Sequence, residues 1–209
     1  MDGIITAVTA QKKRKDRVNV YVDEQYSFSL PAEKTLGLAP GRYLSAEAIR
    51  DYKELDQKQK ALERALGYLA VRPRSRREIR QYLHAKGFYE SAIEAVLHRL
   101  TELGYLDDAA FARMWVESRS RSRPRGVIGL RRELQEKGIN ETLISDALQD
   151  FDEFSVARAA VSGKLKKWRG LAPMQRRQKI YAFLYRRGFS GTTCRDICES
   201  AAGEQEMSP

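Results

Sequence analysis

One short pattern occurs three times in this chain, and it constrains the fold more than any other feature. Each copy has a leucine four residues before a glycine and an apolar residue directly after it; the copies are Leu83 to Phe88, Leu134 to Ile139 and Leu184 to Phe189. The glycines are 51 and 50 residues apart, and apolar residues recur at matching distances around them. A period of this length is typical of tandem supersecondary units that stack side by side.

Within each copy the residue pattern predicts three helices. The segment from Leu62 to Leu69 carries apolar residues on one helical face. Ser75 and Glu78 have the spacing of a capping box at the start of a second helix, and Gly87 ends that helix. A third helix follows in each unit, and the other two units repeat this order. Their expected inward side chains include Phe111, Met114, Trp115, Phe154, Ala157, Val161 and Leu165.

The residues before the repeats have a different period. Val18, Val20 and Val22 alternate with polar residues or tyrosine, which is the pattern of a half-buried strand. Tyr26 to Leu30 alternate in the same way, and Ile4 to Val8 supply a third strand. Short helices are expected over residues 31–56, one of them capped by Ser45 and running toward Leu55.

The predicted fold is therefore mainly α: an elongated array of three tandem three-helix repeats, preceded by a small N-terminal β-hairpin or three-strand module. The expected divisions are the strand module over 1–56, the repeats over 57–106, 107–151 and 152–202, and a polar tail over 203–209.

Charge is distributed unevenly along the chain. Lys and Arg number 38 against 28 Asp and Glu, a net charge of +10. Residues 1–56 hold nine basic and nine acidic side chains, residues 57–149 hold 18 and 12, and residues 150–209 hold 11 and 7. The whole excess therefore lies in the repeats, which favours a polyanionic partner.

Basic residues gather at one place in every unit, between its first and second helices. Stacked units are expected to align these clusters along one edge, where they suit a phosphate backbone or an acidic protein groove. The alternative is that each cluster is a solvated loop. The candidate filament- or nucleic-acid-binding residues are Arg72, Arg74, Arg76, Arg77, Arg119, Arg121, Arg123, Arg125, Arg131, Arg132, Lys164, Lys166, Lys167, Arg169, Arg176 and Arg177.

Four smaller features of the sequence also bear on partner or metal binding. The basic run from Lys12 to Arg17 either contacts phosphate or a partner, or is a solvated hairpin tip. The cation before each repeated glycine is explained by the negative end of its helix. Cys194 and Cys198 share a helix face like metal ligands, but they replace aliphatic residues of the other repeats, which favours buried thiols over zinc. Trp168 is the best aromatic candidate for a partner contact.

No known catalytic or cofactor motif is found in the sequence. It lacks a Walker A loop, GxGxxG, HExxH and GxSxG, so we expect no enzyme, no catalytic residues, no metal and no cofactor. It also lacks a long apolar run and a secretory N-terminus, and its two cysteines form no disulfide framework. The expectation is a cytoplasmic monomer with no membrane partner.

At three stretches the sequence resembles the RecX family, the regulators of RecA-type recombinases. These stretches run from Arg74 through Gly87, from Leu103 through Ala112 and from Gly126 through Ile139. The resemblance is close over about residues 57–150 and looser over 151–200, where Cys194 and Cys198 depart from the expected aliphatic residues. The N-terminal strands look like the extension that some members carry.

The resemblance implies a non-catalytic modulator that lies in the groove of the RecA nucleoprotein filament. Such a protein impedes filament growth or favours disassembly, and so lowers recombinase and ATPase activity in recombinational repair and the SOS response. Alone, it is expected to bind single-stranded or duplex DNA weakly. The alternative is a stand-alone DNA-binding protein, since three-helix units resemble helix-turn-helix modules.

Overall fold

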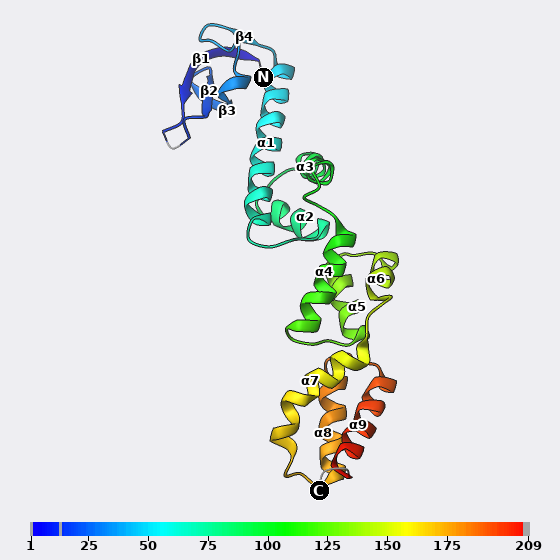
Figure 1. The fold of residues 1–209 in the computed structure, drawn as a ribbon. Helices are drawn as coiled ribbons and strands as arrows, with labels where there is room; N and C mark the ends of the chain where they lie inside the picture. The colour runs from blue at the N-terminus through cyan, green and yellow to red at the C-terminus, as the bar shows by residue number, and fades with distance from the viewer. Residues whose placement is uncertain (1, 13, 207–209) are drawn as a thin grey trace. The chain divides into compact units, whose positions relative to one another are not determined.

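A computed structural model of the 209-residue chain describes residues 2–12 and 14–206, and for 202–206 it describes the backbone alone. Figure 1 shows the order of the helices and strands. The chain divides into two compact units, and each is described by itself. The first comprises residues up to Pro73 together with Ile79–Leu106; the second comprises Arg74–Glu78 and everything from Asp107 onward.

The first unit opens with a small antiparallel sheet. Its strands are β1 (Gly3–Ala10), β2 (Arg17–Val22), β3 (Gln25–Pro31) and the two-residue β4 (Tyr43–Leu44), in the order β3-β2-β1-β4. The three predicted strands are thus present, and β4 is an addition. The β2–β3 hairpin turns at Asp23 and Glu24, both with positive φ, which is the backbone twist that a two-residue hairpin loop favours.

One helix, α1 (Ala46–Leu69), extends well beyond Leu55, so the helix that Ser45 caps is longer than predicted. Ser45 caps it as predicted, accepting a hydrogen bond from the amide of Ala48. No glycine or proline interrupts residues 46–66, so nothing in the local sequence ends the helix near Leu55. Its N-terminal half packs on the sheet, where Ile49 joins a core around Phe28. Its C-terminal half packs on the helices that follow.

A buried ion pair fastens the sheet to α1. The guanidinium of Arg17 on β2 lies 2.6 Å from a carboxylate oxygen of Asp56, and both side chains are almost wholly buried. The same carboxylate accepts hydrogen bonds from the amide and hydroxyl of Ser29. Arg17 therefore does not belong to a solvated hairpin tip, as one interpretation of the basic run had it. Lys13 of that run lies outside the described residues.

Helices α2 (Arg76–Ala85) and α3 (Glu90–Glu102) complete the first repeat. Ile79 and Leu83 of α2 are fully buried and pack with Ile93 and Leu97 of α3 and with the C-terminal half of α1. Each helix contributes the residues of one face to this core, as the helical spacing of apolar residues in the sequence predicts.

The second unit holds the other two repeats. They consist of α4 (Asp108–Arg121), α5 (Val127–Glu136) and α6 (Glu141–Leu148), then α7 (Glu153–Trp168), α8 (Pro173–Tyr185) and α9 (Gly191–Glu206). Each repeat has its own core, and in both the middle helix presents two fully or almost fully buried residues, Leu130 with Leu134 and Ile180 with Leu184.

Most of the inward side chains predicted for this unit pack in its cores. Asp107 caps α4 with hydrogen bonds from two amides, and Asp152 caps α7. Two expected inward residues are wrong, because Met114 and Phe154 are both 38% exposed. Met114 lies outside the buried face of α4, which comprises Phe111, Ala112 and Val116.

The repeated glycines end their helices as predicted. Gly87, Gly138 and Gly188 have φ angles of +80°, +80° and +73°, which only glycine adopts without strain. Cys194 and Cys198 are buried thiols in the core of the third repeat. In the described part of the chain, no helix is both long enough and apolar enough to cross a lipid bilayer.

Candidate functional site

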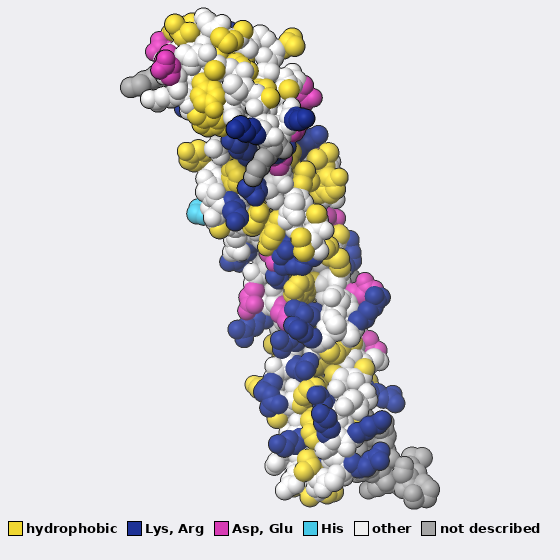
Figure 2. Space-filling view, turned by 90° about the vertical axis from the view of Figure 1, so that its left-hand side faces the viewer, with side chains coloured by type: hydrophobic (Ala, Val, Ile, Leu, Met, Phe, Trp, Pro, Cys, Tyr) yellow, Lys and Arg dark blue, Asp and Glu magenta, His cyan; other side chains and the backbone are white. Residues whose placement is uncertain are grey.

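The candidate site is a groove of the second unit in which arginines from two repeats converge. Arg125 and Arg132 come from the α4–α5 segment, and Arg186 and Arg187 come from the turn after α8. Together with Tyr185 they border a cavity of about 540 Å³. Figure 2 shows that Lys and Arg side chains are numerous over this unit on the face in view.

Close backbone contacts between glycines hold the two arginine pairs beside each other. The amide of Gly126 donates to the carbonyl of Arg187 at 3.2 Å, and the amide of Gly129 donates to the carbonyl of Gly188 at 3.1 Å. A Cβ on Gly126 or Gly129 would lie 2.1 Å or 2.6 Å from the facing backbone. The segment Gly126–Gly129 therefore packs directly on the turn after α8, and side chains at these two glycines would push the two segments apart.

Two carboxylates neutralise part of this groove. Glu133 forms ion pairs with Arg119 at 2.7 Å and Arg125 at 3.1 Å, and it also accepts a hydrogen bond from the indole of Trp115. Glu136 pairs with Arg132, at 3.1 Å, one turn away on α5. These contacts order the α5 side of the groove and leave its charge partly balanced.

The α8 side of the groove is not balanced in this way. Among the described residues, neither Arg186 nor Arg187 forms an ion pair with a carboxylate. The guanidinium of Arg187 lies 4.5 Å from the ring centre of Phe183 and donates to the carbonyl of Pro124. Partial burial lowers the pKa of Arg187, and the like charges of Arg125 and Arg186 lower it further. An anion in the groove would relieve this repulsion.

The remaining predicted residues of the second repeat are exposed, except for the half-buried Arg131, and most pair with a carboxylate of their own or a neighbouring helix. Arg121 pairs with Glu117 and Arg131 pairs with Glu141. Arg123 is exposed and has a positive φ of 61° at the end of the α4 segment. These side chains are accessible to a partner, but the structure does not gather them into the groove.

The predicted residues of the third repeat are only partly exposed. Lys166, Lys167 and Arg169 are exposed and Lys164 is half-buried. Arg176 is a correction: only 7% of it is exposed, because its position on α8 faces the repeat core. Arg177 is exposed, and with Arg176 it borders a different cavity. Trp168, expected at a partner contact, is half-buried with its ring edge-on to Phe183.

The predicted residues before α5 lie in two segments. Arg74, Arg76 and Arg77 belong to the stretch that joins the second unit. The side chain of Arg77 packs over Gly138, and the amide of Arg76 donates to Asp108. Arg72 belongs to the first unit, where it donates to the carbonyl of Pro73.

Arg186 and Arg187 were absent from the candidate residues predicted from sequence. The helix end alone does not explain the cation before each repeated glycine, because all three cations also contact specific partners. The Lys86 ammonium lies 5.7 Å from the ring centre of Tyr82. Lys137 forms an ion pair with Glu78 at 2.6 Å, and Arg187 contacts Pro124. A usable signal was present, because the third copy alone has two adjacent arginines before its glycine.

Comparison with known proteins places this arrangement in a family. Four family models match: the RecX N-terminal domain over residues 3–37, and the first, second and third RecX three-helix domains over 61–100, 107–148 and 152–198.

Curated relatives and solved structures agree with this assignment. The chain is 37% identical to Regulatory protein RecX of Bacillus licheniformis over 191 residues, which cover 89% of this chain and 73% of that protein. It is 34% identical to the protein of the same name from Lactobacillus delbrueckii subsp. bulgaricus, covering 98% and 77%. A crystal structure described as regulatory protein RecX covers 94% of this chain and 99% of its own, with 29% identity and a TM-score of 0.72. The fold is also similar to that of RecX from Lactobacillus salivarius, with a TM-score of 0.63 and 21% identity, covering 70% of this chain and 97% of the other.

Proposed function

The chain belongs to the RecX family, and from this premise we propose that it regulates a RecA-type recombinase by binding the nucleoprotein filament. In this proposal it impedes filament growth, and so lowers recombinase and ATPase activity during recombinational DNA repair and the SOS response. It acts as a cytoplasmic monomer, without catalysis of its own and without a cofactor.

The observation that carries the proposal is the convergence of four arginines on one groove. A nucleoprotein filament presents phosphates and protein carboxylates, and guanidinium groups bind both through paired hydrogen bonds. Arg186 is exposed, and among the described residues it has no carboxylate partner. Ile128 and Tyr185 border the same groove with 59% and 65% of their surface exposed, which gives the site apolar contact area beside its charge.

The geometry favours contact with an anionic surface over sequence-specific reading of duplex DNA. Helix α5 begins with Val127, Ile128 and Gly129, none of which has a polar side chain. The backbone of Gly129 is occupied by its contact with Gly188. A recognition helix reads base edges with polar residues near its N-terminus, and α5 has none in those positions.

The decisive experiment is inhibition of recombinase ATPase on single-stranded DNA by the double variant Arg132→Ala/Arg186→Ala. We expect about a tenfold higher half-inhibitory concentration, since two charge-assisted contacts are removed. The matched control is Arg113→Ala/Arg195→Ala, two exposed arginines of the same unit outside the groove, which should inhibit like the parent protein. Equal inhibition by both double variants would remove the groove from the mechanism.

A pulldown separates regulation from simple DNA binding. The protein should be retained by recombinase together with single-stranded DNA far better than by the DNA alone. Tight retention on one duplex sequence at moderate salt, without recombinase, would instead support a stand-alone DNA-binding protein.

A further inference from the structure

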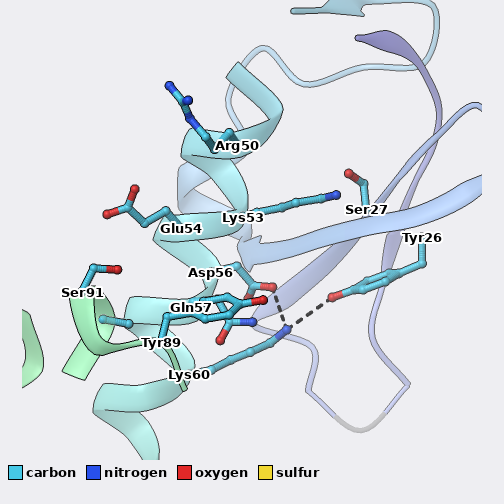
Figure 3. A pocket seen from close by; sticks show the side chains of 11 residues that line it. Tyr26, Ser27, Arg50, Lys53, Glu54, Asp56, Gln57, Lys60, Tyr89 and Ser91 are labelled. Atoms are coloured by element: carbon cyan, nitrogen blue, oxygen red, sulfur yellow. Dashed lines mark hydrogen bonds and ion pairs between the residues drawn. The ribbon is translucent and has the colours of Figure 1, made fainter. Parts of the chain in front are cut away.

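A second cavity lies in the first unit, and its basic and aromatic side chains have no part in the proposed regulation. It measures about 480 Å³ and lies between β3, α1 and the start of α3. Figure 3 shows Tyr26 reaching in from the strand, Lys53, Gln57 and Lys60 from successive turns of α1, and Tyr89 from the segment before α3. This volume is within the range of pockets that hold small organic ligands.

The negative charge in the cavity wall is already compensated. Asp56 is 4% exposed, and its carboxylate is shared by Arg17, Ser29 and Lys60, with the Lys60 ammonium 2.6 Å away. The Lys60 ammonium also lies 3.3 Å from the hydroxyl oxygen of Tyr26, which fixes one end of that ring. Burial opposes the charge of Lys60, but the contact with Asp56 outweighs it and raises its pKa.

Positive charge remains at the mouth of the cavity. Lys53 is exposed, and Figure 3 shows its side chain extending across the opening toward Ser27. Among the described residues Lys53 forms no ion pair. Arg50 is 73% exposed and lies 3.9 Å from Glu47, its nearest carboxylate partner. The carboxylate of Glu54 is held by Lys58 at 2.7 Å. An anionic ligand group would therefore meet the cations of Lys53 and Arg50.

Two aromatic rings flank these cations. Tyr26 is 51% exposed and Tyr89 is 70% exposed, although both are large side chains with apolar faces. The ring of Tyr26 is held by an edge contact with Tyr21, with 6.1 Å between ring centres. Exposed aromatic faces beside cations are the recurring design of sites that bind unpaired bases and their phosphates.

We infer that this cavity binds one unpaired nucleotide of a single-stranded nucleic acid. In this site a base stacks on Tyr89 or Tyr26, its phosphate contacts Lys53 and Arg50, and the amide of Gln57 is available to the base edge. An acidic peptide would use the cations but would leave both aromatic faces without a planar partner. The site does not depend on the proposed regulation, because it lies in the first unit and needs no recombinase.

Photocrosslinking to a short oligonucleotide tests the location directly. The probe is a tetrathymidylate in which one base is 5-iodouracil, irradiated with the full-length Arg132→Ala/Arg186→Ala protein so that the groove of the second unit is weakened. We expect the crosslink on Tyr26 or Tyr89, mapped by mass spectrometry. Crosslinks confined to residues outside the cavity would overturn the assignment.

Affinity measurements on the same background test the chemistry. Tyr89→Ala should weaken binding of fluorescent tetrathymidylate about tenfold through the loss of stacking, while Tyr89→Phe should bind like the parent. Lys53→Ala should make the affinity for tetrathymidylate depend less steeply on salt concentration, by the amount expected for the loss of about one phosphate contact. Tyr105→Ala and Lys34→Ala are controls, since both residues are exposed, belong to the same unit and lie outside the cavity.

Two further probes separate a nucleotide site from a general anion site. An abasic tetranucleotide with the same phosphates should bind about tenfold more weakly than tetrathymidylate and should not respond to Tyr89→Ala. A glutamate decapeptide should compete poorly. Equal binding of the abasic strand, or competition by the peptide at the same concentration as tetrathymidylate, would refute the nucleotide assignment. Thermal melts of each variant show whether the fold is retained.

Discussion

The carboxylate of Asp108 accepts a hydrogen bond from the backbone amide of Arg76, with 2.8 Å between the two atoms. The same arrangement recurs in the next repeat, where the amide of Val127 donates to Glu153 at 2.7 Å. Asp108 and Glu153 are the first residues of α4 and α7, and Arg76 and Val127 are the first residues of α2 and α5. In both places an acidic residue opening one helix satisfies an unpaired amide at the start of another.

Despite this shared geometry, the two carboxylates should respond to pH with opposite signs. Burial alone would raise the pKa of Glu153, but hydrogen bonds from Ser190, Thr193 and Val127 outweigh it and lower the pKa. Its stabilising contribution is therefore complete above the ordinary glutamate pKa and is lost as the pH falls through the lowered value. We expect Glu153→Gln to cost about 2 kcal/mol at pH 7, because hydrogen bonds to a charged acceptor are lost. Denaturant unfolding at pH 7 and at pH 3 should show this difference shrinking in acid.

Asp108→Asn provides the contrasting prediction. Burial raises the pKa of Asp108, and its hydrogen bond from Arg76 does not fully compensate. Its ionised form therefore opposes folding at neutral pH, and this penalty fades as the pH falls through the raised value toward the ordinary one. Asparagine keeps the carbonyl acceptor and removes the charge. The free energy of unfolding at pH 7 should therefore fall by less than about 0.5 kcal/mol, or it should rise. A loss as large as that of Glu153→Gln would contradict the assigned sign.

Gly129→Ala tests the close contact between α5 and the turn after α8. Both Gly129 and Gly163 lie in helices, where alanine is favoured by about 1 kcal/mol. A Cβ at position 129 would lie 2.6 Å from the carbonyl oxygen of Arg187, whereas a Cβ at 163 would meet nothing within 4 Å. Gly163→Ala should therefore raise the melting temperature and Gly129→Ala should lower it by several degrees. Calorimetry on the two variants checks this; an increase for both would show that the contact yields without cost.

Local sequence signals predicted most of the helices, because each depends on residues a few positions apart. The capping pair Ser75 and Glu78 and the repeated glycines behave as their spacing indicates. The length of α1 was not predicted, because the point at which a helix stops packing on a sheet and starts packing on other helices leaves no mark in local helix propensity. Local propensity likewise gives no sign of the buried ion pair of Asp56, because its partner Arg17 lies 39 residues away.

The candidate site was predictable in part for the same reason. Arg125 and Arg132 belong to a cluster that is visible in the sequence, and the structure places both at the groove. Arg186 and Arg187 join them only because Gly126 and Gly129 allow backbone contact with the next repeat. That approach depends on packing between repeats, which hydrophobic periodicity does not encode. The prediction that Arg176 contacts a partner was wrong, because a basic residue in a cluster can still occupy a core-facing helix position.

Asp56→Ala should destabilise the attachment of the sheet to α1. Removing this carboxylate leaves Arg17 buried without its ion-pair partner, a change that typically costs about 3–5 kcal/mol. Asp51→Ala removes an exposed aspartate five residues earlier on the same helix and should cost under about 0.5 kcal/mol. Hydrogen exchange of β1 to β3 measures the effect where it occurs. Unchanged protection of these strands in Asp56→Ala would show that the ion pair contributes nothing to their attachment.

Cys194 and Cys198 should resist alkylation in the folded protein. Burial raises the pKa of Cys194 to about 11, and the neighbouring Cys198 and Glu153 add to the shift; burial also raises the pKa of Cys198. At pH 8 a thiol of pKa near 11 is about two hundredfold less ionised than an unperturbed one, and the thiolate is the reactive species. Iodoacetamide labelling followed by mass spectrometry should therefore be slow in buffer and fast in denaturant. An added Ser200→Cys, exposed on the same helix, is the control and should react at once. Equal rates for all three thiols in the folded protein would mean that the third repeat opens far more readily than its buried core indicates.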